Sequence, residues 1–111
     1  MSLIEKLRKA RETKVEAGGF TFIVRRPTDV EMMELGGTRS VARLFPFVVG
    51  WDGVSSLSMG IPGGDAHPLP FDSALCGEWL ADRPDLFGPL VEAILGSYAD
   101  HAKALEATAK N

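Results

Sequence analysis

The chain has 111 residues, of which 45% are hydrophobic and 24% charged, a composition typical of a small globular domain and unlike that of a disordered chain. Its 12 Lys and Arg side chains stand against 15 Asp and Glu, and the formal net charge of −3 disfavours wholesale binding to nucleic acid. The single cysteine excludes an intramolecular disulfide, and no apolar run approaches the roughly 20 residues that cross a bilayer. We therefore expect a soluble, intracellular, single domain over residues 1–111.

The charge is distributed unevenly along the chain. Residues 1–44 carry nine basic and six acidic side chains, whereas residues 45–111 carry three basic and nine acidic ones. Such an asymmetry can steer a partner, or let the positive end of one copy meet the negative end of another. The simpler interpretation is that folding brings the two halves together and the surface charge averages out.

The first segment has the pattern of a short amphipathic helix over residues 3–12. Ser2 and Glu5 have the spacing of a capping box. The apolar residues that follow recur at helical spacing, and they are Leu3, Ile4, Leu7 and Ala10. Ten residues make a marginal helix in water, so we expect this one to dock on the protein's own core.

A two-stranded β-hairpin is expected over residues 14–25. The pair Gly18-Gly19 tolerates the positive φ angles of a primed turn, and a run rich in aromatic and β-branched residues follows it. In that run Phe20, Phe22 and Val24 alternate with other residues and should share the core face.

The middle of the chain predicts two short helices, over residues 29–35 and 39–45. Thr28 and Glu31 form a second capping box before the first of them, and Pro46 limits the second. Residues 50–70 are rich in glycine and proline, which indicates an irregular surface loop. We expect this loop to be the most mobile segment.

The C-terminal part predicts helices over residues 73–82 and 88–108. Pro84 separates them, and Pro89 sets the start of the second because proline is best tolerated in a first helical turn. The last helix has the longest amphipathic pattern, formed by Leu90, Val91, Ile94, Leu95, Tyr98 and Leu105. The expected fold class is α+β, mainly helical, with the N-terminal hairpin.

The sequence contains no pattern that indicates catalysis, a metal or a cofactor. Cys76 falls on the apolar face of a predicted helix, where an inert buried thiol is expected. His67 and His101 lack neighbours at ligand spacing, and neither a nucleophile elbow nor a phosphate-binding loop occurs. We expect no catalytic residues and no metal ligands, which leaves an interaction domain.

Four segments stand out by the order in which they follow one another. They read FIVRRPTD at 22–29, FVVGWDGV at 47–54, PFD at 70–72 and WLADRPDLFGPL at 79–90. In this order, over residues 20 to about 105, they resemble the tail assembly chaperones of long-tailed bacteriophages and related prophages.

The resemblance implies a specific role. Members of this family bind the long helical tape measure protein in the infected cell, keep it soluble and help tail tube subunits polymerise around it, and they are absent from the finished virion. Many are made in two lengths by a programmed ribosomal frameshift, and the extension recruits the tube subunit. This chain would be the shorter form, with Lys110-Asn111 encoded by a slippery sequence, and it would work in the host cytoplasm.

A tape measure helix would be bound through its apolar stripe. We expect an apolar groove bordered by the last helix, the hairpin or the loop at Trp51, although a core position explains Trp51 equally well. The candidate partner-binding residues are Trp51, Leu90, Ile94 and Tyr98. The expected partners are the tape measure protein, the tail tube protein through an extended form, and further copies of the chain, with no membrane and no nucleic acid.

Two other classes of function remain open. One is a structural component of the virion, such as a neck or tail-completion protein. The other is a small nucleic-acid-binding regulator that uses the basic residues near the N-terminus, which are Lys6, Arg8, Lys9, Arg11 and Lys14.

Overall fold

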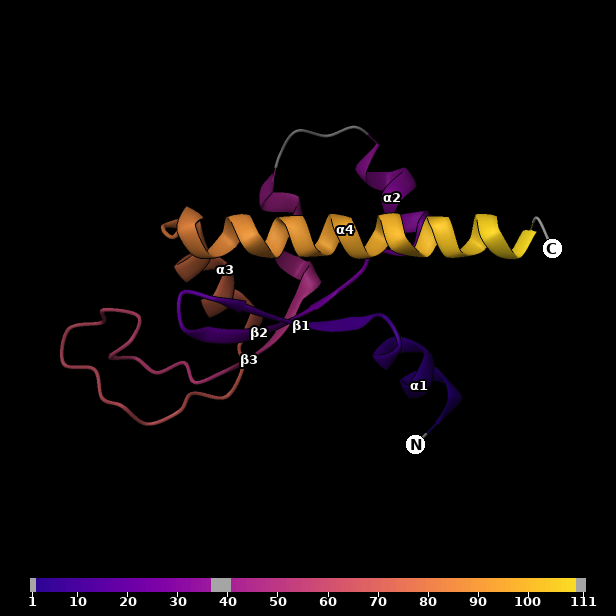
Figure 1. Cartoon of the computed structure of the whole chain (residues 1–111). Helices are drawn as coiled ribbons and strands as arrows, with labels where there is room; N and C mark the ends of the chain where they lie inside the picture. Colours follow the sequence, from indigo (N-terminus) through magenta and orange to yellow (C-terminus); the bar gives the residue numbers. More distant parts are fainter. Residues whose placement is uncertain (1, 37–40, 110–111) are drawn as a thin grey trace.

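A three-stranded antiparallel sheet packs beneath a long C-terminal helix (Figure 1). The computed structural model describes residues 2–36 and 41–109. The elements in chain order are α1 (Leu3–Lys9), β1 (Glu12–Ala17), β2 (Phe20–Arg25), α2 (Asp29–Leu35), the 3-10 helix η1 (Val41–Phe47), β3 (Val48–Asp52), α3 (Ser73–Ala81) and α4 (Pro84–Ala109). The strand order is β1-β2-β3. The α+β class expected from the sequence is confirmed.

The hydrophobic core lies between one face of the sheet and the two C-terminal helices. Phe22 and Val24 of the central strand have no exposed surface. The helices supply the other side of the core, chiefly through Cys76, Trp79, Leu80, Leu86, Phe87, Leu90 and Ile94. Because β2 is the middle strand, its alternating residues place the sheet directly against α3 and the first half of α4.

The hairpin follows the sequence prediction closely. Its strands pair from Glu12 opposite Arg25 to Ala17 opposite Phe20. The turn residues Gly18 and Gly19 have φ angles of 58° and 85°, the left-handed values that a primed two-residue turn requires. Gly18 is also close to α4, since a Cβ atom at this position would collide with the side chain of Leu86. The turn is therefore part of the packing between sheet and helix.

The first helix differs from its prediction in length and in position. The helix expected over residues 3–12 ends at Lys9, because Glu12 already pairs with Arg25 and the chain must be extended there. The cap is as expected, with the amide of Glu5 donating to Ser2 Oγ over 3.1 Å. None of the seven described residues of α1 is buried, so the expectation that it docks on the core is wrong.

The third strand was not predicted. β3 pairs with β2 so that Trp51 lies opposite Phe22 and Gly50 opposite Ile23, with a bulge before Val24. Gly50 permits this approach, because a Cβ atom there would lie 3.0 Å from Ile23 Cδ1. The segment is a short apolar run with β-branched residues, a strand signal that the neighbouring Pro46 obscured.

Of the helix expected over residues 39–45, the first two residues lie outside the described part of the chain. The rest forms η1, which continues through Pro46 to Phe47 as a 3-10 helix. The other helix predicted in the middle of the chain, over residues 29–35, is confirmed, with the capping box between Thr28 and Glu31 complete on both sides.

α3 is close to its prediction, whereas α4 begins four residues earlier than expected. Its first residue is Pro84, which fits the first helical position because the amide missing from proline has no partner there in any helix. Pro89 therefore lies inside the helix and removes one backbone hydrogen bond. The early start turns Leu86 and Phe87 into the core, where they are 0% and 6% exposed. Their burial offsets the lost hydrogen bond.

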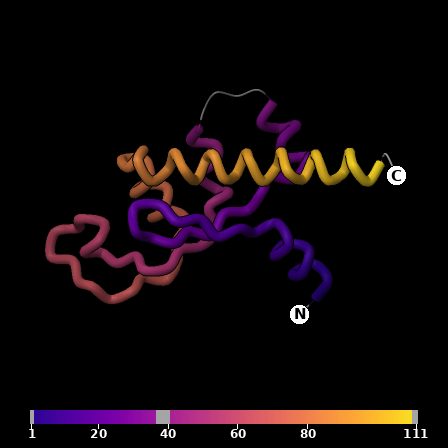
Figure 2. The backbone as a smooth tube through the Cα atoms, viewed as in Figure 1, coloured from indigo at the N-terminus to yellow at the C-terminus, as the bar shows by residue number. Residues whose placement is uncertain are grey.

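The molecule is elongated. Its radius of gyration is 15.6 Å and its principal extents are 57 × 36 × 21 Å, whereas a compact chain of this length would have a radius of gyration of about 13 Å. Figure 2 shows the reason: α1 and the C-terminal part of α4 extend to one side of the sheet, and the loop over residues 53–72 extends to the other. No helix within residues 2–36 and 41–109 is long and apolar enough to span a membrane.

The hairpin turn provides a test of how the sheet is fastened to α4. We expect Gly18→Ala to lower the free energy of unfolding by about 2–4 kcal/mol, because it combines a positive φ angle with a collision against Leu86. Gly19→Ala has the strained φ angle but nothing near its Cβ atom, so it should cost only about 1–2 kcal/mol. Urea unfolding measures both; equal losses would contradict the packing of the turn on α4.

Candidate functional site

Two of the predicted partner-binding residues lie in the core. Leu90 and Ile94 are both 0% exposed, and they face the sheet from the first half of α4. The helical periodicity identified the correct apolar face, but that face is covered by the protein's own strands. In this conformation neither side chain has any surface to offer a partner, and we replace them with exposed residues below.

Trp51 is half-buried and fastens the long loop to the sheet. Its indole Nε1–H donates to the carbonyl oxygen of Leu69 over 2.9 Å. Its ring lies 5.1 Å from that of Phe71 and 6.1 Å from that of Trp79, both in edge-to-face arrangements. Trp51 therefore holds the far end of the loop against the core. This agrees with the core position that the sequence analysis gave as the alternative to a binding role for Trp51.

Tyr98 connects α4 to α2. Its hydroxyl donates to Asp29 Oδ1 over 2.7 Å, and His101 Nε2 lies 3.6 Å from the other carboxylate oxygen. The hydrogen bond from Tyr98 lowers the pKa of Asp29, and the same bond raises the pKa of Tyr98. Asp29 is the first residue of α2, where a negative charge also complements the helix dipole. Tyr98 is thus engaged within the chain.

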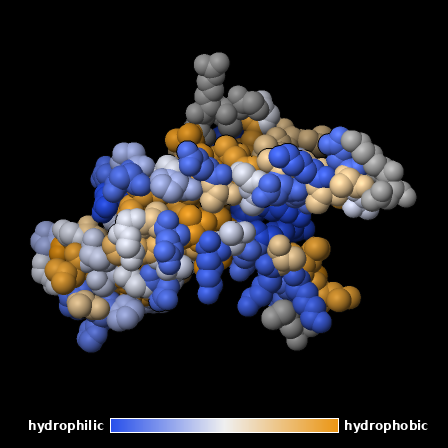
Figure 3. All heavy atoms as spheres, viewed as in Figure 1, coloured by the Kyte–Doolittle hydropathy of each residue, from blue (hydrophilic) through white to orange (hydrophobic). Residues whose placement is uncertain are grey.

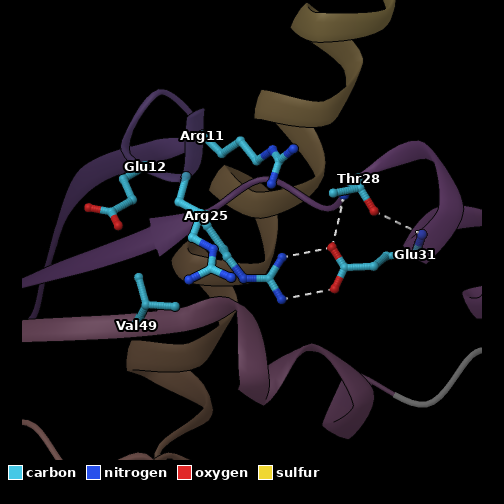
Figure 4. Close-up of a pocket in the computed structure, with 7 residues that line it drawn as sticks. Arg11, Glu12, Arg25, Thr28, Glu31 and Val49 are labelled. Atoms are coloured by element: carbon cyan, nitrogen blue, oxygen red, sulfur yellow. Dashed lines mark hydrogen bonds and ion pairs between the residues drawn. The ribbon is translucent and has the colours of Figure 1, made fainter. Parts of the chain in front are cut away.

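An open pocket of about 420 Å³ lies where α1, β2 and α2 meet (Figure 4). Its lining is polar and consists of Arg8, Arg11, Glu12, Arg25, Thr28 and Glu31, with Val49 the one apolar member. Three guanidinium groups thus face two carboxylates, which leaves a small excess of positive charge. The Nε atom of Arg11 is buried with no acceptor among the described residues.

Arg25 uses this pocket to join three elements. Its guanidinium donates to both carboxylate oxygens of Glu31 over 2.7 and 2.9 Å, and it lies 4.4 Å from the centre of the Phe47 ring. Glu31 in turn accepts from the amide of Thr28 over 2.9 Å. The hydrogen bonds from Arg25 chiefly, opposed by partial burial, lower the pKa of Glu31 to about 2. Arg25 is engaged by both carboxylate oxygens of Glu31 and by the Phe47 ring, so we interpret the pocket as a structural junction.

A different depression, which we call the α3 groove, lies between α3 and the loop over residues 53–72. It has a volume of about 360 Å³. Four of its lining residues are apolar, and we call them the floor of the groove: Met59, Ile61, Leu75 and Trp79. Its rim carries Glu78, Asp82 and Arg83, of which Arg83 is paired with Asp85 at 2.9 Å. Neither Glu78 nor Asp82 forms an ion pair within the described part of the chain, so the rim has an unbalanced negative charge.

The loop that forms one wall of the α3 groove is irregular, as expected, but it is internally hydrogen-bonded. The amide of Leu57 donates to the carbonyl of Asp65 over 3.0 Å, and the amide of Asp65 donates to Ser56 Oγ over 2.9 Å. Gly64 fits this arrangement because a Cβ atom would lie 2.8 Å from the backbone of Ser56 and Leu57. The wall is therefore a defined structure rather than an open strand of chain.

Trp79, which lines the groove, has an indole N–H group in an unusual environment. The side chain is only 8% exposed, and its buried Nε1–H has no acceptor among the described residues. An unsatisfied buried donor costs about 1–3 kcal/mol. Within the described residues, Trp79 thus lines the groove while its own indole N–H stays buried without a partner.

The groove residues were not among those singled out from the sequence. Ile61 follows a glycine and precedes a proline in a segment without periodicity, and Leu75 belongs to a helix that reads as core. The sequence signal for the groove was an isolated apolar residue in a glycine-rich loop. Exposed apolar residues are too common in proteins for this signal to identify a binding site. The groove does border the loop at Trp51, one of the three positions considered for a binding groove.

Cys76 and His67 are the other described side chains that the sequence raised as candidates for chemistry. Cys76 is buried, and burial raises the pKa of its thiol to about 11, which keeps it protonated at neutral pH. His67 is exposed, and its amide donates to Asp65 Oδ1 over 3.0 Å. Across residues 2–36 and 41–109, no three His, Cys, Asp or Glu side chains are grouped so as to hold a metal ion.

Comparison with known proteins adds no relative. No protein-family model, no curated protein and no solved structure matches the chain. Function must therefore be argued from the surface of this molecule and from the order of the four segments described above.

The ion pair between Arg25 and Glu31 makes stability depend on pH in the acid range. The pKa of Glu31 is lowered from 4.5 to about 2, so the stabilisation is present above pH 4.5 and is lost as the pH falls towards 2. The Glu31 side chain is 29% exposed. Allowing for screening by solvent, we expect Glu31→Gln to cost about 1–2 kcal/mol at pH 7 and to flatten the pH profile between 4.5 and 2.

Glu34→Gln on the same helix is the matched control, because Glu34 is exposed and outside this ion pair. Thermal unfolding followed between pH 2 and pH 7 would measure both variants. A pH profile of Glu31→Gln that parallels the wild type would contradict the assignment.

Proposed function

We propose that this protein is a tail assembly chaperone of a long-tailed bacteriophage or prophage. In this proposal it binds amphipathic helical segments of the tape measure protein, keeps them soluble and promotes polymerisation of the tail tube around them, without catalysis. It acts in the host cytoplasm and is absent from the mature virion. The order of the four segments supports the identity of the client, and the α3 groove supports the mode of binding.

The single observation that carries the binding mode is the apolar floor of the α3 groove with its acidic rim. A helix lying in a groove inserts side chains from one face, spaced three and four residues apart. Ile61 is 41% exposed and Leu75 half-buried, so both retain surface for such side chains. Glu78 and Asp82 would favour helices whose apolar stripe is bordered by lysine or arginine.

The acidic C-terminal part of the chain also suits a solubilising role. A tape measure helix left bare in the cytoplasm exposes an apolar stripe that promotes aggregation. Several copies of a small domain with net negative charge would cover the stripe and add charge repulsion between complexes. This requires affinity for a face of a helix rather than for one unique sequence.

Substitutions in the α3 groove test the binding mode. We expect Ile61→Glu and Leu75→Glu each to weaken binding to helical peptides from the tape measure protein by about 10–100-fold, because each removes an apolar contact and adds negative charge. Leu57→Glu is the matched control, since Leu57 belongs to the same loop, is 58% exposed and does not line the groove. Calorimetric titration measures the three affinities. Equal losses in all three variants would place the binding surface elsewhere.

The content of purified particles separates the chaperone from a structural component of the virion. We expect mass spectrometry to detect this chain in the infected cell and not in finished particles, with the tape measure protein detected in both as a control. Detection of the chain in particles at the abundance of tail proteins would favour the structural role.

Lys9 and Lys14 lie together near a depression on β1. A nucleic-acid-binding role can therefore be tested by a gel shift at several salt concentrations.

A further inference from the structure

The pocket where α1, β2 and α2 meet, which we call the arginine pocket, contains two arginine side chains without a carboxylate partner. Arg8 is exposed and Arg11 is half-buried, and neither forms an ion pair within residues 2–36 and 41–109. The third arginine of the lining, Arg25, is held by Glu31. The pocket therefore has two halves: a structural ion pair, and two guanidinium groups that the described chain leaves unpaired.

The backbone fixes these two arginines at the junction of α1 with the sheet. The amide of Arg11 donates to the carbonyl of Arg8 over 3.1 Å, which closes the turn after the helix. The amide of Arg26 donates to the carbonyl of Arg11 over 2.9 Å and attaches this turn to the end of β2. Figure 3 shows strongly hydrophilic residues over the junction. Arg8 and Arg11 therefore line the arginine pocket from a hydrogen-bonded turn.

The charges of the arginine pocket leave an excess that one anion would balance. Arg25 and Glu31 neutralise each other. Glu12 is the other carboxylate of the described lining, and it stands against both Arg8 and Arg11. In Figure 4 the carboxylate of Glu12 points away from the guanidinium groups of Arg11 and Arg25. The pocket thus attracts a negatively charged group.

Arg11 is held in this pocket at a cost in free energy. Its Nε atom is buried and has no acceptor among the described residues. Buried donors without a partner are uncommon in folded proteins, and each calls for an explanation. The same guanidinium has further N–H groups on its terminal nitrogens, and these are the donors that an anion would use. An anion bound there would offset the cost of leaving Nε unpaired.

The residue types of the lining favour an oxyanion over other ligands. A guanidinium group is planar and donates parallel hydrogen bonds, a geometry that matches the oxygens of a carboxylate or a phosphate. Val49 is the one apolar residue of the described lining, so an apolar ligand would gain little there. The depression beside β1 is different, because its cations are Lys9 and Lys14, which lack this planar geometry.

We propose that Arg8 and Arg11 form a binding site for one oxyanion, the carboxylate or phosphate group of a ligand. Arg8 belongs to α1, and Arg11 lies where the chain enters β1. A bound oxyanion therefore joins α1 to the sheet through charge-assisted hydrogen bonds. Since none of the seven residues of α1 is buried, this contact stabilises a helix that is too short to be stable by itself.

Nuclear magnetic resonance titration of the nitrogen-labelled protein tests the site. Sodium phosphate and sodium acetate are added separately at pH 7, with sodium chloride adjusted to keep the ionic strength constant. We expect the Nε–H signal of Arg11 and the amide signals of residues 8–12 to shift and to saturate with a Kd of about 1–10 mM for at least one of the two anions. The tighter anion identifies the group that the site prefers, and sodium chloride alone should give no saturating shift.

Single substitutions separate this site from a general effect of positive charge. Arg8→Gln and Arg11→Lys should each weaken binding about tenfold, because the first removes a guanidinium and the second keeps the charge but loses the paired donors. Lys9→Gln is the matched control: Lys9 is adjacent to Arg8 and carries the same charge, but it does not line the arginine pocket. This variant should change the Kd by less than about twofold.

Two results would overturn the proposal. One is the lack of a saturating shift with either anion up to about 100 mM, well above the expected Kd. The other is an equal loss of affinity in Arg8→Gln and Lys9→Gln, which would show that the anion responds to diffuse positive charge. Arg8 is exposed, so its substitution should leave the fold intact, and an unchanged amide spectrum outside residues 8–12 would verify this.

This inference does not depend on the proposed function. The arginine pocket and the α3 groove share no lining residue. If tape measure peptides fail to bind while phosphate or acetate saturates the pocket, the proposed function is removed and the oxyanion site stands. If the peptides bind at the α3 groove while neither anion saturates the pocket, the reverse holds.

Discussion

The packing of the central strand against α3 and α4 is the interaction on which the rest of the molecule depends. Phe22 and Val24 have no exposed surface, and the buried side chains of both C-terminal helices gather over them. The other features are attached to this layer: Arg25 joins α2 and η1 to the end of the strand, and Trp51 holds the long loop. Because the core is confined to this layer, α1 and the surface of the loop remain free to make other contacts.

The local chemistry of the sequence explains much of the fold. The capping residues at Ser2 and Thr28 mark helix starts that the structure confirms, and Gly18-Gly19 marks the hairpin turn. These signals work because they act over a few residues and need no knowledge of the partner elements. The errors arose where a tertiary contact overrode a local rule, as where burial of Leu86 and Phe87 outweighs the cost of Pro89 inside α4.

The candidate site was less predictable than the fold for a physical reason. Periodicity shows which face of a helix is apolar, but not what covers it. The apolar faces of α1 and α4 look alike in sequence, yet Ile94 is fully buried and Leu3 is 81% exposed. The α3 groove is formed by a helix and the aperiodic loop that precedes it, so no periodic pattern in the sequence marks its lining. A surface built across such segments becomes visible only when the chain is folded.

The uneven burial of α4 has a consequence for how the protein unfolds. Its buried residues all lie between Leu86 and Ile94, and every described residue from Ala102 to Ala109 is exposed. These last two turns draw nothing from the core, so they can fray and reform while the aromatic cluster stays intact. Far-ultraviolet circular dichroism would then begin to change at lower temperature than tryptophan fluorescence. A single melting temperature would not describe both ends of this helix.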